Sequence, residues 1–316
     1  MTQNAPISDF DMVKGVVESE LGQPISEFFS EFAEKPLASA SLGQVHKAKL
    51  RATGETVVVK VQHGRLREQV PGDLNIVQIA VDIGCWLFPE FKYKWLAVAF
   101  KRDLPPELDY HKEARNAERC SEMFKSWSNV SVPKVYSEFT RERILVMSYE
   151  EGTPVTHVKK MHEQGINLRE LSNLISEAFN HMIFREGFVH GDPHPGNLFA
   201  RKKADGELEL VLLDHGIYTA LSTECRLGYT KLWRGILTQD ELLLKEASKE
   251  LGAEGHELFT AMVTSRKFED VMDKSKKQKL KARLGDRTDE EAKADMKKFA
   301  AANHKNIVST LGDINH

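Results

Sequence analysis

The stretch FVHGDPHPGNLFA, from Phe188 to Ala200, decides how the rest of the chain is interpreted. It combines histidines, prolines, glycines, an aspartate and an asparagine, and no apolar repeat of helical or strand period runs through it. Its two prolines fix the backbone and remove amide donors. Such a stretch is either a loop shaped for a chemical task or a stiff polar turn, and other parts of the sequence must decide between these two interpretations.

The composition is typical of a globular chain. The 316 residues suffice for one large domain or two lobes with a full core. Hydrophobic residues make up 41% and charged residues 29%, which are ordinary fractions. The formal net charge of -3 gives no electrostatic argument for nucleic acid or for an anionic membrane surface. We therefore expect no nucleic-acid partner.

Membrane-spanning, targeting and cysteine signals are weak. The first residues are acidic and lack an apolar core segment, so no signal peptide is predicted. The most apolar window, residues 74–88, is broken by Asp82 and Gly84 and is too short for a transmembrane segment, so it predicts a buried helix. Cys85, Cys120 and Cys225 show no C-x-x-C spacing, which predicts free thiols, with Cys120 placed where it could be exposed.

Hydrophobic periodicity and turn residues predict an α+β arrangement. The first half is rich in strands with inserted helices, and the second half, from residue 153, is mostly helical. We expect the N-lobe to span residues 1–152, with a helical N-terminal segment, and the C-lobe to span residues 153–316. The expected helices cover 9–22, 25–32, 73–88, 105–127, 168–187 and most of the chain after Thr223, and the expected strands include 43–50, 55–62, 133–139, 142–151 and 207–213.

Four stretches carry residues suited to phosphoryl transfer. The first is a turn of small residues that would let backbone amides approach phosphates, namely Ala38, Ser39, Ala40, Ser41, Leu42, Gly43 and Gln44. Lys60, at the end of VVVK, would neutralise phosphate charge. In the stretch from Phe188 to Ala200, Asp192 would orient or deprotonate the attacking hydroxyl, and Asn197 follows five residues later. Asp214, after an apolar strand, would bind Mg²⁺ together with Asn197.

The order of these stretches favours a two-lobed protein-kinase-like fold. Protein kinases place a Gly-rich loop, a strand lysine, a D-x-x-x-x-N catalytic loop and a D-F-G turn in the same order. Each motif alone is also compatible with an ordinary turn or strand. A zinc site formed by His190, His194 and His215 is the rival interpretation, but no cysteine is near and the helix-face spacing of zinc ligands is missing. We expect these histidines to shape the loop through hydrogen bonds.

The chain resembles the UbiB-like atypical kinases, the aarF-domain group associated with coenzyme Q biology. The resemblance rests on PLASASLGQVHKA, VVVKVQ, ELDYHKEARN, FVHGDPHPGNLF and LLDHGIY, and extends from about residue 10 to 270. It implies an Ala-rich loop at residues 38–44 that restrains nucleotide binding, and an E-x-D element at Glu107 and Asp109. It also implies that Glu113 pairs with Lys60 and aims it at the phosphates of ATP.

Two departures from the family pattern affect what can be carried over. The K-x-G-Q element, which lies over the active site in the family, is not found; Glu20–Pro24 reads ELGQP, with no lysine before the Gly-Gln pair. We expect the chain to be a fragment or a divergent gene model, and autoinhibition by that element is not transferred. His215 replaces the phenylalanine of the D-F-G turn, as in family branches distinct from the core coenzyme Q members.

The resemblance implies an ATPase or unorthodox kinase that uses ATP and Mg²⁺. It further implies a role in quinone or lipid homeostasis, a lipid or quinone-pathway membrane partner, and a location at a mitochondrial or other organellar membrane. A small-molecule phosphotransferase of the aminoglycoside or choline kinase type is one alternative, because such enzymes share H-G-D-x-x-x-x-N. A nucleotide-responsive scaffold without catalytic activity is the other alternative.

Overall fold

The computed structural model describes residues 7–88, 94–253 and 255–273. The chain divides into two compact units, and each is described by itself. The first contains Met1–Ile76 and Ala99–Ala220, and the second contains Val77–Val98 and Leu221–His316. The helical course expected after residue 273 lies outside the described residues. The expected boundary between lobes at residues 152 and 153 stays a prediction.

Most secondary structure belongs to the first unit. Its helices are α1 (Phe10–Leu21), α2 (Ile25–Phe28), α5 (Tyr110–Met123), α6 (Val158–Glu163) and α7 (Leu168–Asn180). Its strands are β1 (Phe29–Phe32), β2 (Ala38–Ser39), β3 (Gly43–Leu50), β4 (Thr56–Gln62), β5 (Val130–Ser131), β6 (Ile144–Ser148), β7 (Thr153–Pro154), β8 (Phe188–His190), β9 (Leu198–Lys202), β10 (Leu208–Leu212) and β11 (Tyr218–Ala220). Two further helices, α3 (Leu66–Leu87) and α4 (Lys94–Glu107), contribute to both units.

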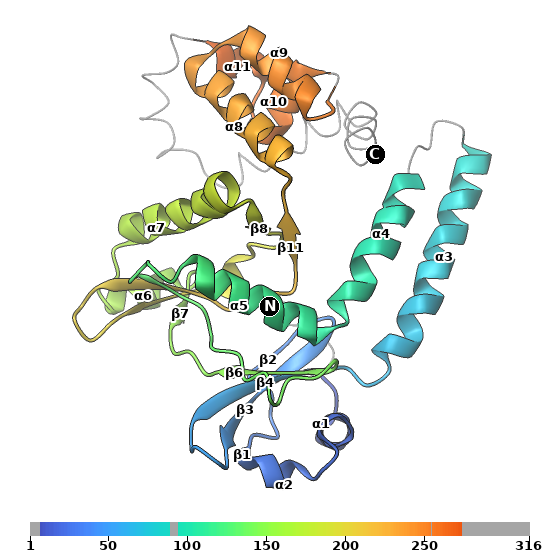
Figure 1. The fold of residues 1–316 in the computed structure, drawn as a ribbon, viewed down its shortest axis with the longest axis vertical. Helices are drawn as coiled ribbons and strands as arrows, with labels where there is room; N and C mark the ends of the chain where they lie inside the picture. The colour runs from blue at the N-terminus through green and yellow to red at the C-terminus, as the bar shows by residue number, and fades with distance from the viewer. Residues whose placement is uncertain (1–6, 89–93, 254, 274–316) are drawn as a thin grey trace. The chain divides into compact units, whose positions relative to one another are not determined.

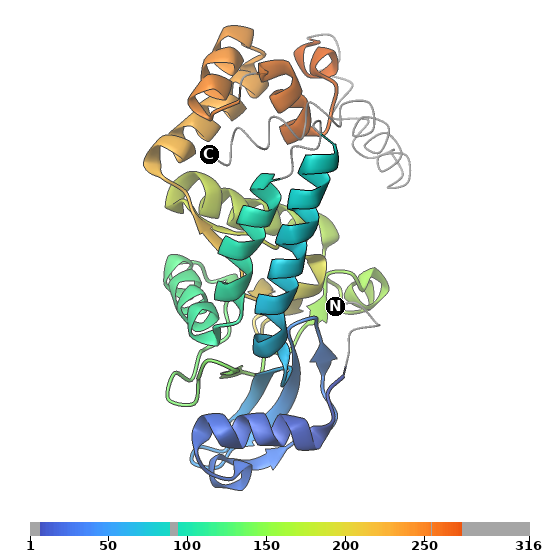
Figure 2. The same ribbon diagram turned by 90° about the vertical axis from the view of Figure 1, so that its right-hand side faces the viewer.

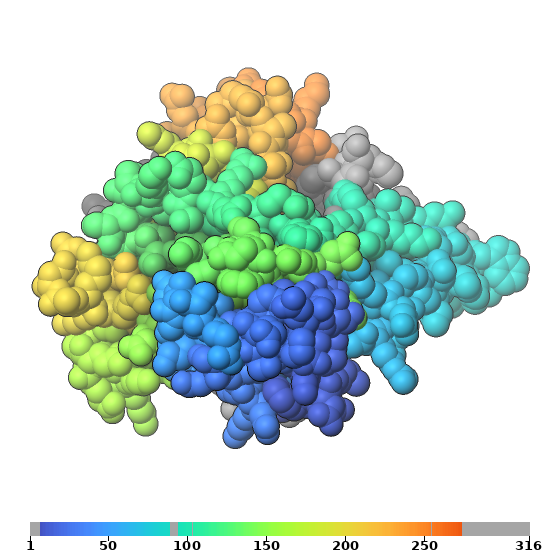
Figure 3. Space-filling view, turned by 60° about the horizontal axis from the view of Figure 1, so that its bottom comes forward, coloured from blue at the N-terminus to red at the C-terminus, as the bar shows by residue number. Residues whose placement is uncertain are grey.

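An antiparallel sheet forms the N-terminal part of the first unit (Figure 1). Its strands lie in the order β1-β3-β4-β6, and β2 pairs with the start of β3. Valines alternate along β4, so that Val57, Val59 and Val61 are buried in a core shared with α1. Lys60 points to the opposite face of the sheet. In Figure 3 the blue atoms, which belong to α1 and the first strands, lie next to one another on the face turned toward the viewer.

Helix α5 packs on the face of this sheet that carries Lys60. Asp109 caps its N-terminus by accepting a hydrogen bond from the His111 amide at 3.0 Å. Tyr110 and Ala114, four residues apart on one side of the helix, pack against Leu145 of β6 in a small buried cluster. This packing places the first turn of α5 over the middle of β4.

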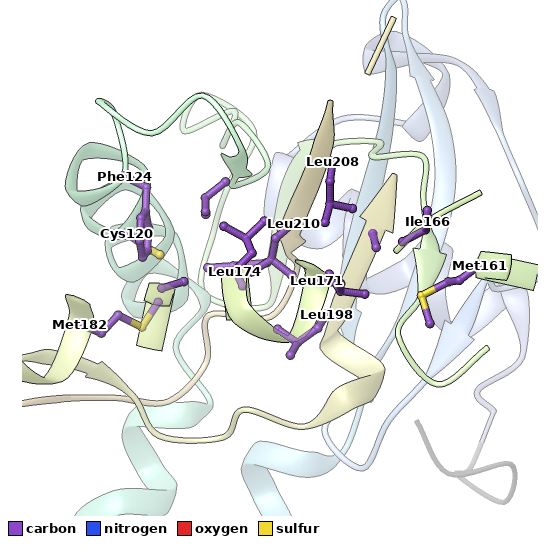
Figure 4. Close-up of a cluster of buried hydrophobic side chains, with 14 residues drawn as sticks. Cys120, Phe124, Met161, Ile166, Leu171, Leu174, Met182, Leu198, Leu208 and Leu210 are labelled. Atoms are coloured by element: carbon purple, nitrogen blue, oxygen red, sulfur yellow. The ribbon is translucent and has the colours of Figure 1, made fainter. Parts of the chain in front are cut away.

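A second sheet has the strand order β5-β10-β9-β7. Helices α5 and α7 contribute to the large apolar core beside it, shown in Figure 4. Leu171 and Leu174 of α7 contribute to this core, together with Leu198 of β9 and Leu210 of β10. After α7 the chain forms a π-helical turn, His181–Glu186, that ends at Gly187, whose φ of 63° is in the left-handed region.

Two strand pairs bracket the functional loops. Strand β8 pairs with β11, with His190 opposite Tyr218, and β9 pairs with β10, with Leu198 opposite Leu212. The loop 191–197 connects β8 to β9, and the turn 213–217 connects β10 to β11. Both connections therefore run between the same two strand pairs. Hence the topology alone brings the loop 191–197 beside the turn 213–217. This turn contains Asp214, His215 and Gly216 and is called the DHG turn below.

The second unit is helical where the structure describes it. It contains α8 (Thr223–Thr238), α9 (Glu241–Glu250), α10 (His256–Thr264) and α11 (Phe268–Met272). Leu232 of α8 and Leu244 of α9 form its buried core, and Gly235 lets the two helices approach closely. Helices α3 and α4 run side by side (Figures 1 and 2). Within the described part of the chain, no helix is both long and apolar enough to cross a membrane.

The predicted fold class is confirmed, and several local predictions were wrong. Residues 29–32 form β1 instead of continuing a helix, because they pair with β3. The prolines at 105 and 106 lie in the last turn of α4, and the next helix begins only at Tyr110. Of the expected strand at 133–139, only Val135 forms an isolated bridge, to Met147. Cys120 is fully buried because the apolar face of α5 packs into the core.

Candidate functional site

The centre of the candidate site is a buried ion pair. Lys60 lies within β4 and Glu113 in the first turn of α5. Lys60 Nζ is 2.7 Å from Oε1 and 2.8 Å from Oε2 of Glu113, so the ammonium group binds both carboxylate oxygens. The side chains are 15% and 5% exposed, which shields the pair from water and fixes the direction of Lys60.

Asp214 completes a charged triad with this pair. Its Oδ1 lies 3.6 Å from Lys60 Nζ and accepts a hydrogen bond from the Gly216 amide at 3.1 Å. Lys60 lowers the pKa of Asp214 to about 2, against the opposing effect of burial. Burial acts to lower the pKa of Lys60, but Asp214 and Glu113 outweigh it and hold that pKa above its ordinary value. Burial raises the pKa of Glu113, against the opposing effect of Lys60. Lys60 therefore faces two carboxyl groups, of which Asp214 is the one held firmly in its ionised form.

The DHG turn is fastened to α5. Asn116 Nδ2 donates to the His215 carbonyl at 2.9 Å, and the backbone of His215 hydrogen-bonds Glu113. His215 is fully buried, and burial lowers its pKa to about 4, so its ring is neutral. Its Nε2 donates to the Leu212 carbonyl at 3.0 Å, which leaves Nδ1 to accept from the Tyr218 hydroxyl at 3.0 Å. The histidine thus holds the turn from within.

His190 connects the loop 191–197 to this turn. The Asp192 amide donates to His190 Nδ1 at 3.1 Å, and the ring also hydrogen-bonds the backbone of Asp214. Burial lowers the pKa of His190, which favours its neutral form. Asp192 itself is exposed, and its carbonyl accepts from the His194 amide at 2.7 Å. The loop therefore has a fixed backbone and an aspartate open to solvent.

Asn197 lies beside the residue that precedes Asp214. It ends a 3-10 turn, is 8% exposed, and its carbonyl accepts from the Leu213 amide at 3.0 Å. Among residues 7–88, 94–253 and 255–273, no group of three or more His, Cys, Asp and Glu side chains is arranged to hold a metal ion. A magnesium site here would consist of an amide oxygen, a carboxylate and oxygens from the nucleotide.

The small-residue turn begins in β2 and ends in β3. Ala38 and Ser39 pair with Val45 and Gln44, and the Ala40 amide donates to the Gly43 carbonyl at 2.8 Å. Ser41 and Leu42 form the bend between them. Val45 lies opposite Lys60 in the sheet register, so the turn ends near the ion pair.

Gly43 is required by close packing. A Cβ atom at Gly43 would lie 2.5 Å from Tyr110 Oη and 2.5 Å from the Val61 carbonyl oxygen, which no larger residue could tolerate without a shift. The Tyr110 ring also lies beneath Lys60, with Nζ 5.3 Å from the ring centroid. Tyr110 therefore connects the small-residue turn to the charged triad.

The remaining predicted residues occupy other positions. Glu107 ends α4, and Asp109 caps α5 and lies 3.9 Å from Arg115. The Gln44 side chain is buried and hydrogen-bonds Ser8 and His46. The nucleotide-binding roles of Glu107, Asp109 and Gln44 stay predictions.

Sequence reasoning missed several residues that hold the site in place. Tyr110 follows the E-x-D element directly, and Asn116 lies three residues after Glu113 on the same side of α5. Helical periodicity around Glu113 could therefore have identified both residues. Ser8 and His63 gave no signal, because their contacts join segments distant in the sequence.

A strand lysine held by a helix glutamate, with an aspartate from a turn after a buried strand beside it, defines the kinase-like class of phosphotransferase folds. The chain belongs to the ABC1 atypical kinase-like domain family, whose model matches residues 1–248.

Curated relatives and a solved structure agree with this assignment. AarF domain-containing kinase 1 of Drosophila melanogaster is 41% identical over 271 residues, covering 85% of this chain and 52% of that protein. AarF domain-containing protein kinase 1 of Mus musculus is 40% identical over 269 residues, covering 84% and 51%. The complex of Rv3197 with erythromycin from Mycobacterium tuberculosis superposes with a TM-score of 0.62 at 27% identity, covering 78% of this chain and 61% of that chain. The chain spans about half the length of the curated relatives it matches.

Proposed function

We propose that this chain binds Mg-ATP and transfers or hydrolyses its terminal phosphate. The observation that carries the proposal is the buried triad of Lys60, Glu113 and Asp214. A lysine held by a buried glutamate is a directed cation, suited to neutralise phosphate oxygens, and catalysis of phosphoryl transfer consists largely of such positioning and charge stabilisation.

The other residues are assigned complementary roles. The backbone of residues 38–44 lies along the phosphates, since small side chains permit close approach. Asn197 and Asp214 hold Mg²⁺, which supplies positive charge to the phosphate oxygens when bound. Asp192, exposed at the surface of the loop, orients the acceptor hydroxyl or water.

We extend the proposal to a setting in quinone or lipid homeostasis, with a lipid or quinone-pathway partner at a mitochondrial or other organellar membrane. Its support is the resemblance of the Ala-rich turn and the E-x-D element to the UbiB-like group, whereas the DHG turn is shared with branches distinct from the core coenzyme Q members. The phosphate acceptor is left open, and a screen of acceptors would separate an ATPase from a small-molecule phosphotransferase.

Thermal unfolding with and without Mg-ATP and Mg-ADP tests the nucleotide site. A ligand that binds only the folded state raises the midpoint, and at 100 times its dissociation constant it adds about 2.7 kcal/mol. We expect a metal-dependent rise for the natural sequence, no rise for Asp214→Ala, and an unchanged rise for Asp205→Ala, which removes an exposed carboxylate elsewhere.

Two results would contradict the proposal. If millimolar nucleotide does not raise the unfolding midpoint of a folded sample, the proposed nucleotide site is wrong. A rise without phosphate release or transfer to any acceptor would favour the nucleotide-responsive scaffold over an enzyme.

A further inference from the structure

The small-residue turn is tied to the segment that precedes α1. Gln44, at the end of the turn, is 1% exposed. Its side-chain amide forms two hydrogen bonds with the backbone of Ser8, one through its oxygen and one through its nitrogen. Its Oε1 accepts from the Ser8 amide at 2.8 Å, and its Nε2 donates to the Ser8 carbonyl at 3.3 Å. A side-chain amide thus recognises one residue of backbone, although the two are 36 positions apart.

His46 fixes the orientation of the Gln44 amide. His46 is fully buried, and burial lowers its pKa, so its ring is neutral. Its Nδ1 donates to the Ala33 carbonyl at 2.7 Å, so that Nε2 must accept a hydrogen bond. The Nε2 atom of Gln44 donates that bond at 2.8 Å. Both N–H groups of the Gln44 amide are then in use within the protein, and its Oε1 accepts one hydrogen bond.

His63 makes a second connection between Ser8 and the turn. Its Nε2 lies 3.1 Å from the Ala40 carbonyl and therefore donates, which leaves Nδ1 to accept from the Ser8 hydroxyl at 2.8 Å. The His63 amide also donates to the Leu42 carbonyl at 3.1 Å. Ser8 is hence bonded to both ends of the turn, at Ala40 through His63 and at Gln44 directly.

We propose that Ser8, Gln44 and His63 form a strap that holds the turn in the conformation that receives the phosphates. They are positioning residues and act through the backbone of residues 40–44. The inference deepens the proposed function and rests on it, because the turn needs to be held only if it receives phosphates. It also assigns the Gln44 side chain to the strap instead of to direct contact with the nucleotide.

Ser8→Ala is the sharpest test, because it removes only the hydroxyl that bonds His63. The dissociation constants of Mg-ATP and of adenosine are measured by calorimetry for the natural sequence and the variant. We expect the constant for Mg-ATP to rise roughly two- to tenfold, as for the loss of one hydrogen bond, and the constant for adenosine to stay the same. Adenosine has no phosphates, so a general loss of folding would not produce this split.

Three comparisons complete the experiment. Ser8→Thr keeps a hydroxyl and should restore the affinity for Mg-ATP. Ser30→Ala removes a hydroxyl bonded to the Lys49 carbonyl at 3.4 Å in the same sheet and should change neither constant. Gln44→Met retains the side-chain volume but removes both bonds to Ser8 and the bond to His46, and should raise the constant for Mg-ATP further.

The outcomes separate the strap from the proposed function. If the natural sequence binds no Mg-ATP, the proposed function fails and the strap fails with it. If the natural sequence binds Mg-ATP and Ser8→Ala binds it equally well or more tightly, the strap alone is overturned. An equal loss of affinity for Mg-ATP and adenosine would also overturn it.

Discussion

At the scale of single residues, the site depends on one cation shared by two carboxylates. Lys60 contacts Glu113 at 2.7 Å and Asp214 at 3.6 Å in a largely buried position. Lys60→Met would leave two carboxylates facing each other without a cation, whereas Glu113→Gln leaves the lysine with one partner. Removing one member of a buried ion pair costs about 3–5 kcal/mol. We therefore expect Lys60→Met to lower the free energy of unfolding by about that amount, and Glu113→Gln by less.

Urea denaturation of both variants measures this order. Lys125→Met, which removes an exposed ion pair with Glu122, serves as the control and should cost less than about 1 kcal/mol. The reverse order, with Glu113→Gln the more damaging change, would show that Asp214 does not share the charge of Lys60.

The neutral histidine of the DHG turn gives stability a dependence on pH. Burial lowers the pKa of His215 from 6.5 to about 4. Between these values the unfolded chain binds a proton that the folded chain does not, so the free energy of unfolding falls as the pH is lowered. The contribution of Asp214 is lost at lower pH, between its ordinary pKa of 3.8 and about 2. The two effects therefore fall in separate ranges of pH.

We expect His215→Phe to flatten the decrease of stability between about pH 6.5 and about pH 4. Its stability at neutral pH should also drop, because Tyr218 Oη and the Leu212 carbonyl lose their partner. Urea denaturation across this range, in EDTA and without nucleotide, measures the slope. His190 keeps a residual slope, since burial lowers its pKa too. An unchanged slope for His215→Phe, equal to that of the exposed-site variant His162→Gln, would contradict the prediction.

At the scale of elements, α5 is the part that connects the N-terminal sheet to the DHG turn. Its first turn holds Lys60 through Glu113, and one turn later Asn116 donates to the His215 carbonyl at 2.9 Å. A shift of the helix along its axis would therefore move the lysine and the DHG turn together. This coupling is a property of the helical period, because residues three apart lie on one side.

Asn116→Ala tests this coupling. It leaves a buried carbonyl without its donor, which costs about 1–3 kcal/mol. We expect a lower unfolding midpoint and a smaller stabilisation by Mg-ATP, since Asp214 is less well held. Glu118→Ala, on the exposed side of the same helix, removes a bond to Ser137 at 3.0 Å and should change the stabilisation little. Equal stabilisation of the Asn116→Ala variant by Mg-ATP would show that α5 does not position the turn.

The sequence predicted the elements that have a strong local signal. Helix α1 ends at Gly22, which has a left-handed φ of 75°, and the β3–β4 hairpin turns at Gly54, where φ is 73°. Glycine favours this conformation, so the sequence marked both positions. Strand β1 was missed because its pairing with β3 decides its conformation, which no local pattern records. The π-helical turn before Gly187 likewise continues an apolar pattern that reads as ordinary helix.

The site was predicted to a similar degree. Lys60, Asn197 and Asp214 follow from motif order, and Glu113 from the family resemblance. The structure joins Lys60 to Glu113 and Asp214 and places Asn197 beside Leu213. The strap of Ser8, Gln44 and His63 did not follow, because a hydrogen bond across 36 or 55 positions leaves no periodic trace. Motif order thus identifies candidate ligand-binding residues more readily than the residues that hold those candidates in place.

At the scale of the whole molecule, every residue assigned to the site belongs to the first compact unit. The turn 38–44, Lys60, Glu113, the loop 191–197 and Asp214 all fall within Met1–Ile76 or Ala99–Ala220. Helices α8 to α11 fall in the second unit and form a core of their own around Leu232 and Leu244. Nucleotide binding should therefore act on the first unit without requiring residues after Ala220.

Hydrogen–deuterium exchange can localise this effect. With saturating Mg-ATP we expect slower exchange of backbone amides in residues 38–44, 191–197 and 213–217, because ligand binding suppresses local opening of the segments it contacts. Exchange in the cores of α8 and α9 should be unchanged. Asp214→Ala, exposed to the same nucleotide, should show no slowing at any of the three segments and so controls for crowding by the ligand. Protection of α8 and α9 equal to that of the loop 191–197 would mean that the first unit alone does not account for nucleotide binding.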